Sequence, residues 1–87
     1  MYEVFVSNEA EKYYKKLEKD TKRRINKCID VISNEPFFGF HIKRLHGELE
    51  GKYRYESGGL RIIYEIDKKN KNVEIKAIRS RGDVYKK

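Results

Sequence analysis

The residues best suited to chemistry in this sequence are three cations of one stretch, Lys52, Arg54 and Arg61. Residues 51–67 read GKYRYESGGLRIIYEID, two arms of alternating polar and apolar residues around a Ser-Gly-Gly turn. Glycine accepts the positive φ angles of tight turns, so the pattern predicts a β-hairpin. Side chains alternate between the two faces of a strand, which puts the three cations on one face, opposite the tyrosines and isoleucines. Such a face could bind a phosphate.

The apolar faces of both arms lie on the same side of the hairpin if the loop holds an even number of residues or if a bulge intervenes. A two-residue loop pairs Glu56 with Arg61, and a four-residue loop pairs Arg54 with Arg61. The cationic face also has a plainer interpretation, in which it is only solvated and Arg61 forms an exposed pair with Glu56. A cross-strand pair of that kind contributes ~0.2–1 kcal/mol. The hairpin alone leaves both interpretations open.

Length and composition limit the class of protein. The chain of 87 residues is long enough for one domain, residues 1–87, with a small core. Its 7 Tyr and 4 Phe are too many aromatic residues for a disordered chain. No apolar run approaches the ~20 residues that span a membrane, and the N-terminus lacks the pattern of a signal peptide. We therefore expect no contact with a membrane.

The cysteine and histidines indicate neither a disulfide nor a metal site. Cys28 is the only cysteine, so it cannot form an internal disulfide, and a cytoplasmic location fits best. His41, His46 and Cys28 show no metal-ligand spacing. We predict that the protein uses no metal and no small-molecule cofactor. Both histidines are expected to be surface or loop residues, because no Asp, Ser or Cys lies at a suggestive spacing from them.

The net charge of +7 is unevenly distributed along the chain. Residues 1–40 hold 8 Lys and Arg against 7 Asp and Glu, whereas residues 41–87 hold 13 against 7. The basic half therefore contains the hairpin. This asymmetry favours a polyanionic partner, either a nucleic acid or an acidic protein.

The first elements expected along the chain are a strand over residues 2–6 and then a helix that begins at Ser7 or Asn8. The apolar residues of this helix recur at helical spacing, in a stripe made of Ala10, Tyr13, Tyr14 and Leu17. Its lysines point away from the stripe and are expected to be only its solvated side: Lys12, Lys15, Lys16 and Lys19.

A second helix is expected to be capped at Asp20-Thr21 and to end before Pro36, since the residue before a proline disfavours helix. Its stripe is Ile25, Cys28, Ile29 and Ile32, and Cys28 is therefore predicted to be a core residue. A short strand within residues 41–47, the hairpin and a last strand from residue 73 complete the chain. In that last strand Ile78 breaks the alternation, so Arg79 needs a bulge, or a place beyond the helices, to avoid the core.

The predicted fold class is α+β, a small single domain with an N-terminal strand and a two-helix hairpin on an antiparallel sheet of about four strands. With this order, and with the segments KRLHGELEGKYR, SGGLRIIYEID and RSRGDVY, the chain resembles the RelE/ParE toxin superfamily of toxin–antitoxin pairs. The resemblance extends from the first strand to Tyr85. It implies a RelE-like fold and a toxin of a type II toxin–antitoxin system.

The RelE branch is the more similar one, and its members cut messenger RNA in the ribosomal A site without a metal. The resemblance implies that the catalytic residues here are Lys52, Arg54, Arg61, Arg79 and Tyr85, and that Lys43, Arg44 and Arg81 bind RNA. It also implies three partners, namely a small acidic RelB-like antitoxin, the ribosome and mRNA. Two alternatives stay open: a ParE-like toxin that poisons DNA gyrase, and an inactive relative that only binds its antitoxin.

Overall fold

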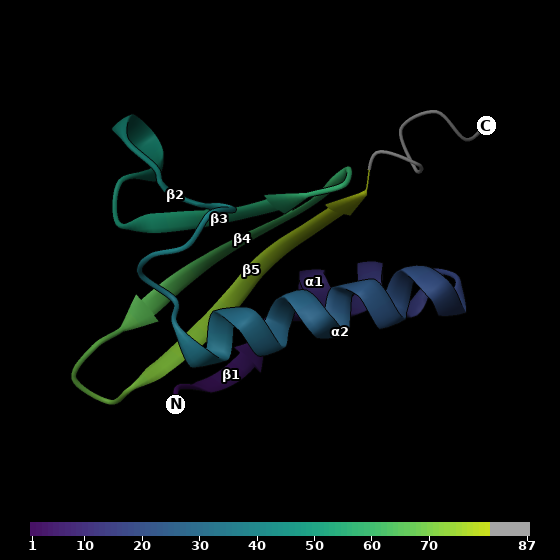
Figure 1. The fold of residues 1–87 in the computed structure, drawn as a ribbon, viewed down its shortest axis with the longest axis horizontal. Helices are drawn as coiled ribbons and strands as arrows, with labels where there is room; N and C mark the ends of the chain where they lie inside the picture. The colour runs from purple at the N-terminus through teal and green to yellow at the C-terminus, as the bar shows by residue number, and fades with distance from the viewer. Residues whose placement is uncertain (81–87) are drawn as a thin grey trace.

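The computed structural model describes residues 1–80, which fold into one five-stranded sheet and two helices (Figure 1). Arg81 and Tyr85 lie outside the described residues. No helix among residues 1–80 is long and apolar enough to cross a membrane. In chain order the elements are β1 (Glu3–Val6), α1 (Asn8–Lys15), α2 (Lys19–Asn34), β2 (Ile42–Arg44), a 3-10 turn (Gly47–Leu49), β3 (Lys52–Ser57), β4 (Leu60–Asp67) and β5 (Asn72–Ser80).

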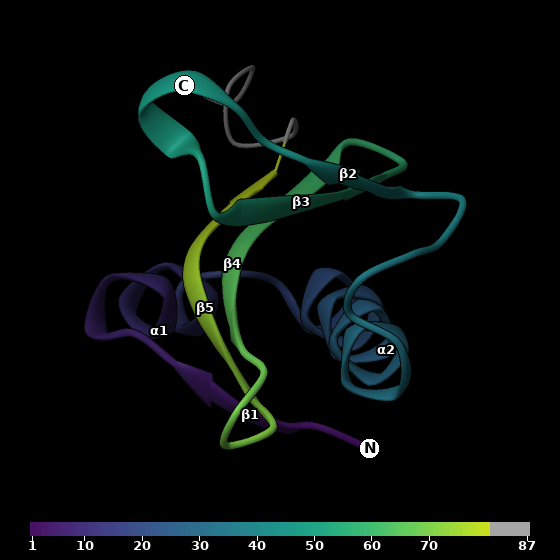
Figure 2. The same cartoon turned by 90° about the vertical axis from the view of Figure 1, so that its left-hand side faces the viewer.

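The predicted α+β class and helical hairpin are confirmed, but the sheet has one strand more than expected and is mixed. Its order is β1-β5-β4-β3-β2, and β1 pairs in parallel with β5, whereas all the other neighbours are antiparallel. The chain leaves β1 through the helical hairpin and reaches β5 only after β2, β3 and β4, and a long connection of this kind permits parallel pairing. Figure 2 shows β2 and β3 crossing β4 and β5 at a large angle, so the sheet is strongly twisted.

The two helices cover different parts of the sheet (Figure 2). The buried residues of α2, Ile25, Cys28 and Ile32, belong to the core formed against the inner face of the sheet. α1 lies along β5 beyond the short β1, where the Tyr13 hydroxyl accepts a hydrogen bond from the Ser80 N–H (2.7 Å). Beyond Ile75, β5 has no strand on this side within residues 1–80, and the Tyr13 hydroxyl pairs with one of the backbone groups that are left open there.

The helix ends agree in part with the predictions. Ser7 is the N-cap of α1, and its hydroxyl oxygen accepts a hydrogen bond from the Ala10 N–H (3.1 Å). The predicted cap at Asp20-Thr21 is wrong, because α2 begins at Lys19 and its N-cap, Glu18, makes no side-chain capping bond. The Cys28 thiol is buried as predicted, and burial raises its pKa, which disfavours a reactive thiolate.

The hairpin of β3 and β4 has the two-residue loop. Gly58 and Gly59 have φ angles of 57° and 86°, and the loop pairs Glu56 with Arg61. Glycine accepts both angles without strain, which fixes the register. Tyr55, Leu60, Ile62 and Tyr64 then lie in the core, and Arg61 faces the other way.

A bulge in β5 turns Arg79 away from the core. Ile63 lies opposite Ala77, but Tyr64 lies opposite Ile75, so Lys76 is an extra residue. The bulge shifts the alternation by one position, which buries Ile78 and exposes Arg79. The sequence allowed either a bulge or a place beyond the helices for Arg79, and the structure shows the bulge.

Candidate nucleic-acid interface

The face of the sheet opposite α2, called the outer face below, brings cations of four strands together. Its members lie in three rows across the strands: Lys52, Glu65 and Glu74; Lys43, Arg54, Ile63 and Ala77; and Glu56, Arg61 and Arg79, with the bulge residue Lys76 beside them. Six cations and three carboxylates make this face positive. The sequence had predicted the cations of β3 and β4 on one face, and the register confirms that placement.

Five of the six cations of the outer face have carboxylate partners within residues 1–80, and Lys43 is the exception. Glu56 lies between two arginines, 3.3 Å from Arg54 Nε and 3.2 Å from Arg61 Nη2. The Arg61 side chain is 51% exposed, so its pair with Glu56 is of the weak, solvent-screened kind. This pair is the one that the solvated interpretation of the face expected, and any anion that binds here must compete with Glu56.

Arg54 is the least accessible of these arginines, with a side chain 28% exposed. Its Nε is buried and makes no hydrogen bond within residues 1–80, although Glu56 Oε1 is 3.3 Å away. The contact is therefore an ion pair without hydrogen-bond alignment. A buried N–H without a well-aligned acceptor is unfavourable, so this arginine is poised for a better-placed anion.

Lys52 forms an ion pair with Glu65, in which Lys52 Nζ lies 2.9 Å from Glu65 Oε2. The hydrogen bond from Lys52, helped by the charge of Lys76, lowers the pKa of the Glu65 carboxyl. Lys76 also lies 3.2 Å from Glu74 and 3.8 Å from Glu65, which raises the pKa of its ammonium. Ion pairs thus hold the side chains of Lys52 and Lys76 on the outer face.

We expect the Lys52–Glu65 pair to give a small, pH-dependent stability. A carboxyl whose pKa is lower in the folded state stabilises the fold above its unfolded pKa, and this contribution is lost as the pH falls through the folded pKa. Urea unfolding should therefore show Glu65→Gln to be less stable than the parent by ~0.2–1 kcal/mol near neutral pH, because the pair is partly exposed. The difference should vanish in acid. Glu48→Gln, at an exposed position in the 3-10 turn, serves as the control and should show no such trend.

Arg79 belongs to the outer face by its backbone, but its guanidinium turns toward α1. Its Nη2 donates to Glu9 Oε2 (3.0 Å), its Nη1 donates to the Ile78 carbonyl (2.7 Å), and its guanidinium carbon lies 5.4 Å from the centre of the Tyr13 ring. Its Cα pairs with that of Arg61. Arg79 therefore links the outer face to the surface of α1. Glu9 is 70 positions away in the sequence, and nothing in the local pattern predicts this contact.

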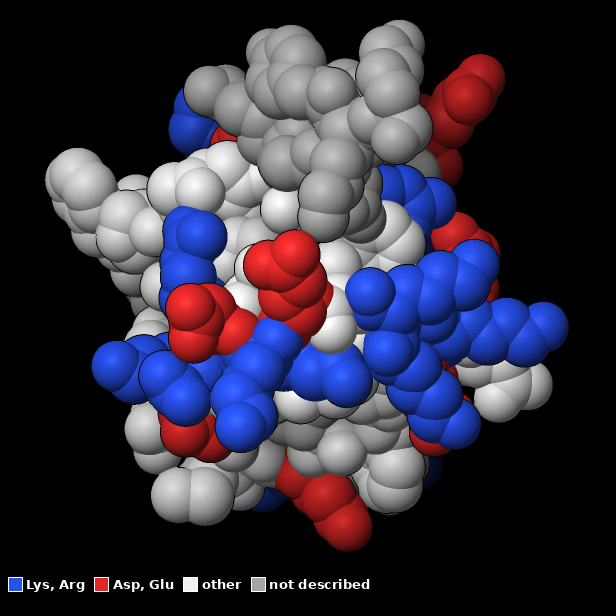
Figure 3. All heavy atoms as spheres, turned by 90° about the vertical axis from the view of Figure 1, so that its right-hand side faces the viewer, with Lys and Arg blue, Asp and Glu red and all other residues white. Residues whose placement is uncertain are grey.

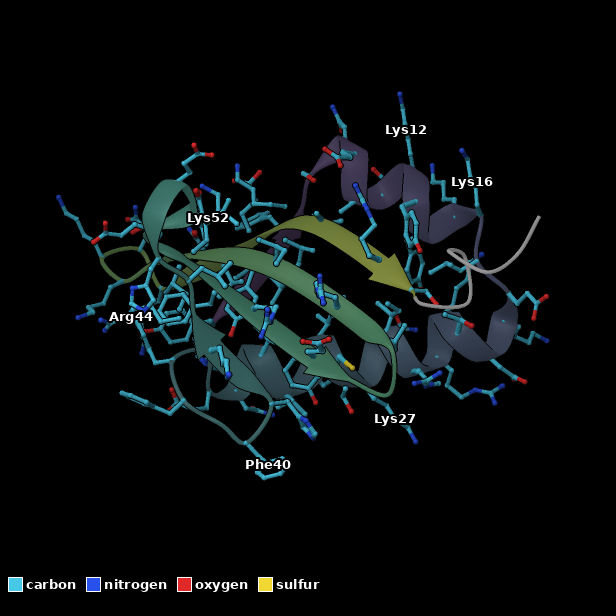
Figure 4. All side chains as sticks on the ribbon, turned by 90° about the horizontal axis from the view of Figure 1, so that it is seen from above. Lys12, Lys16, Lys27, Phe40, Arg44 and Lys52 are labelled. Carbon is cyan, nitrogen blue, oxygen red and sulfur yellow. The ribbon has the colours of Figure 1, made fainter. Side chains whose placement is uncertain are left out.

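The remaining predicted residues are not all brought together. Lys43 lies opposite Arg54 on the outer face, whereas Arg44 lies opposite Tyr53 on the other side of β2. There Arg44 lines a separate hollow with Phe37, Tyr53 and Lys68. Figure 4 labels both Arg44, which lies on β2, and Lys52, which lies on β3, at the same end of the molecule. Arg81 and Tyr85 stay predictions, since they lie beyond residue 80.

Sequence reasoning missed Lys76 as a member of the outer face and Lys12 and Lys16 as neighbours of Arg79. The irregular alternation at Ile78 was the one local signal for Lys76. Neither histidine joins the outer face: His41 packs against Phe40 and Tyr55, and His46 precedes the 3-10 turn. No group of His, Cys, Asp or Glu within residues 1–80 could hold a metal ion.

Comparison with known proteins gives a consistent result. A family model described as the ParE-like toxin of type II bacterial toxin–antitoxin systems matches residues 4–87. The chain is also similar to a chain of the toxin–antitoxin complex RelBE2 from Mycobacterium tuberculosis, with 26% identity and a TM-score of 0.83 over 92% of this chain and 98% of the other. No curated protein matches at a significant level.

Two further structures have the same fold. In the archaeal RelE–RelB complex from Pyrococcus horikoshii the similar chain is 29% identical, with a TM-score of 0.76 over 93% of this chain and 96% of the other. The isolated E. coli RelE toxin is 17% identical, with a TM-score of 0.78 over 92% of this chain and 84% of the other. At that identity the similarity to the E. coli protein concerns the fold alone.

Proposed function

The chain belongs to the ParE-like toxins of type II bacterial toxin–antitoxin systems, and from this premise we propose that it is a RelE-like endoribonuclease that cleaves mRNA in the ribosomal A site. One observation carries the proposal. The cations Lys52, Arg54, Arg61 and Arg79 come from three adjacent strands and lie in neighbouring rows of one face. A positive surface of this kind supports the binding of a phosphodiester and of the charge that develops on it during cleavage.

The proposed reaction needs only the substrate and side chains. The 2′-oxygen of the nucleotide attacks the adjacent phosphorus, and the bond from phosphorus to the 5′-oxygen of the next nucleotide breaks. The 2′-hydroxyl proton passes to a base, and an acid gives a proton to the leaving 5′-oxygen. The products are a 2′,3′-cyclic phosphate and a 5′-hydroxyl, so atoms and charge balance without a cofactor.

The arginines and Lys52 have distinct proposed roles in this scheme. Arg61 grips the phosphate, because guanidinium forms bidentate hydrogen bonds to phosphate oxygens. Lys52 and Arg54 stabilise the developing charge and help to activate the 2′-hydroxyl. Arg79 assists the leaving oxygen, and Tyr85 orients the nucleotide or acts as the base. The reference pKa values of tyrosine and lysine are about 10, and a cationic site lowers the cost of a tyrosinate or a neutral lysine.

The carboxylates of the outer face are compatible with this chemistry. Exposed ion pairs such as Arg61–Glu56 contribute ~0.2–1 kcal/mol, so a phosphate can replace Glu56 at little cost. Weak acid–base groups also suit an enzyme whose substrate is positioned by the ribosome, because positioning itself supplies much of the rate.

We also propose a small acidic antitoxin as partner, in the cytoplasm. The similar chains from M. tuberculosis and P. horikoshii are held in complexes with their antitoxins. The basic excess of residues 41–87, 13 cations against 7 carboxylates, favours an acidic segment that folds on this surface. Expression of the toxin without its antitoxin should then arrest bacterial growth.

A second candidate function is supported by the family description and by the ion pairs that the cations of the outer face form with carboxylates. The matching family is named ParE-like, and ParE toxins act on DNA gyrase. Carboxylates beside every cation of the outer face in β3 and β4 would also suit a surface that does no phosphate chemistry. A toxin that only binds its antitoxin is the third candidate.

Two assays on one preparation separate these candidates. Primer extension on mRNA in programmed ribosomes should show a new end within the A-site codon when the purified chain is added. A gyrase supercoiling assay with the same preparation should show no inhibition. Intact mRNA together with blocked gyrase would replace the proposal by the gyrase poison, and inactivity in both assays of a folded, antitoxin-binding chain would favour the inactive relative.

A further inference from the structure

A hollow of about 400 Å³ lies between α1 and the end of β5. Its lining consists of Glu9, Lys12, Tyr13, Lys16 and Arg79. Three of these five residues are cations, and the one carboxylate, Glu9, is bonded to Arg79 (3.0 Å). The hollow is therefore positive, and Arg79 is the one lining residue that it shares with the three rows of the outer face.

Lys12 lies in the last turn of α1, and Lys16 is the C-cap residue with αR backbone angles, so the two side chains, four positions apart, are neighbours at the end of the helix. Like charges at this spacing destabilise a helix. Neither lysine has an ion pair within residues 1–80, whereas Lys15, on the same helix, is paired with Glu11 (3.6 Å). Figure 4 shows Lys12 and Lys16 extending in similar directions, on the opposite side of the molecule from Lys27.

The sequence alone indicated that these lysines were the solvated side of a helix. The fold changes this interpretation, because α1 runs along β5 and brings them to Arg79. Figure 3 shows this end of the molecule, where Lys and Arg side chains form groups at the surface with Asp and Glu side chains between them. An unpaired pair of lysines beside a fixed arginine is an arrangement that a bound anion would stabilise.

We propose that this hollow binds a second phosphate of an RNA backbone, next to the phosphate that the outer face holds. The inference rests on the proposed function, since one RNA strand runs from the outer face across the edge of β5 to the hollow. Arg79 supplies the continuity, because its Cα pairs with that of Arg61 while its guanidinium lies against Tyr13 in the hollow. Lys12 and Lys16 then act as mobile point charges for the phosphate, and Arg79 is the fixed one.

RNA fits the hollow better than an acidic antitoxin does. Three of the five lining residues are cations, and the aromatic ring among them, that of Tyr13, already lies against the Arg79 guanidinium. A peptide that folds on a toxin needs apolar contacts to offset its loss of entropy, whereas a phosphate needs only charge and hydrogen-bond donors. The antitoxin is therefore an outcome that the experiment must exclude.

The test measures binding of the full chain to an RNA that cannot be cleaved, a fluorescent oligonucleotide of about 12 nucleotides with 2′-O-methyl groups throughout. Anisotropy titrations over about 50 to 300 mM KCl give the slope of log K against log salt, which counts phosphate contacts at ~0.7 per contact on a single strand. The double variant Lys12→Ala/Lys16→Ala should lower this slope by about 0.7–1.4 and weaken binding roughly tenfold near 100 mM salt.

The matched control is Lys15→Ala/Lys27→Ala, which removes the same charge from exposed positions of α1 and α2 outside the hollow. It should keep the parental slope to within about 0.3. Equal losses in both double variants would mean a diffuse charge effect and would overturn the proposal. A parental slope in Lys12→Ala/Lys16→Ala would also overturn the proposal. If that variant keeps the parental slope but loses affinity for the antitoxin, the hollow binds the antitoxin.

The outcome is distinguishable from that of the proposed function. If the parent leaves A-site mRNA intact but Lys12→Ala/Lys16→Ala lowers the slope and the control does not, the nuclease proposal is wrong and the phosphate site stands. If the parent cleaves mRNA and Lys12→Ala/Lys16→Ala binds RNA with the parental slope, only the hollow is wrongly assigned. Far-UV circular dichroism checks that both double variants fold, which exposed lysine substitutions should permit.

Discussion

Arg61→Ala is expected to slow A-site mRNA cleavage by ~10²–10³, because removal of one preorganised contact to the developing charge typically costs that much. Arg61 is half exposed and its pair with Glu56 is weak, so the substitution should leave the fold and antitoxin binding intact. Single-turnover cleavage on programmed ribosomes measures the effect, and growth arrest after induction provides the cellular counterpart. Loss of cleavage with retained antitoxin binding would locate the defect in the chemistry.

Arg79→Ala should have an effect of the same size. It also removes the contact with Glu9 on α1, but both side chains are more than half exposed, so the fold should persist. The matched control is Arg23→Ala, an exposed arginine of α2 whose i,i+3 pair with Asp20 spans 3.5 Å. Parental cleavage rates in both Arg61→Ala and Arg79→Ala would show that the outer face is not the site.

The second large effect concerns the register that puts Arg61 on the outer face. Ile62 is fully buried in the core, so Ile62→Ala should lower the free energy of unfolding by ~2–5 kcal/mol. Such a loss is a large part of the ~5–15 kcal/mol that stabilises a typical domain. Urea unfolding followed by circular dichroism measures it.

The control for this prediction is the next residue, Ile63→Ala, with the same change of side chain. Ile63 lies opposite Arg54 and Ala77 on the outer face and is only partly buried, so its loss should cost less than about 1 kcal/mol. Because a slip of one residue would exchange the two faces, the ratio of the two effects reports the register directly. Equal destabilisation, or a larger effect at Ile63, would place Arg61 toward the core and contradict the arrangement of the site.

The sequence was sufficient for those parts of the fold that local patterns encode. The two glycines determine a tight turn, and the alternation around them places Tyr55, Ile62 and Tyr64 in the core and Arg61 on the other face. The helical stripes likewise predicted the burial of Ile25, Cys28 and Ile32. These features depend on side-chain periodicity, which is visible in a single segment.

The remaining features depend on contacts between distant segments. The parallel partner of β1 is chosen by the path of the helices, so its own residues do not reveal that pairing. The contact of Arg79 with Glu9 and the proximity of Lys12 follow from α1 lying along β5. The prediction of a cap at Asp20-Thr21 was wrong because the occurrence of a good capping residue is only a preference, and the observed N-cap, Glu18, lies two residues before Asp20.

The measurement that tests the central claim most directly uses ribosomes programmed with two messages that differ at one atom. One message is all-ribose, and the other carries a single 2′-deoxynucleotide at the A-site cleavage position. The proposed mechanism uses the 2′-hydroxyl as nucleophile, so the purified toxin should cut the first message, leave a 2′,3′-cyclic phosphate, and leave the second intact at that position. Equal cleavage of both messages, or no cleavage of the all-ribose message by a folded chain that binds its antitoxin, would contradict the account.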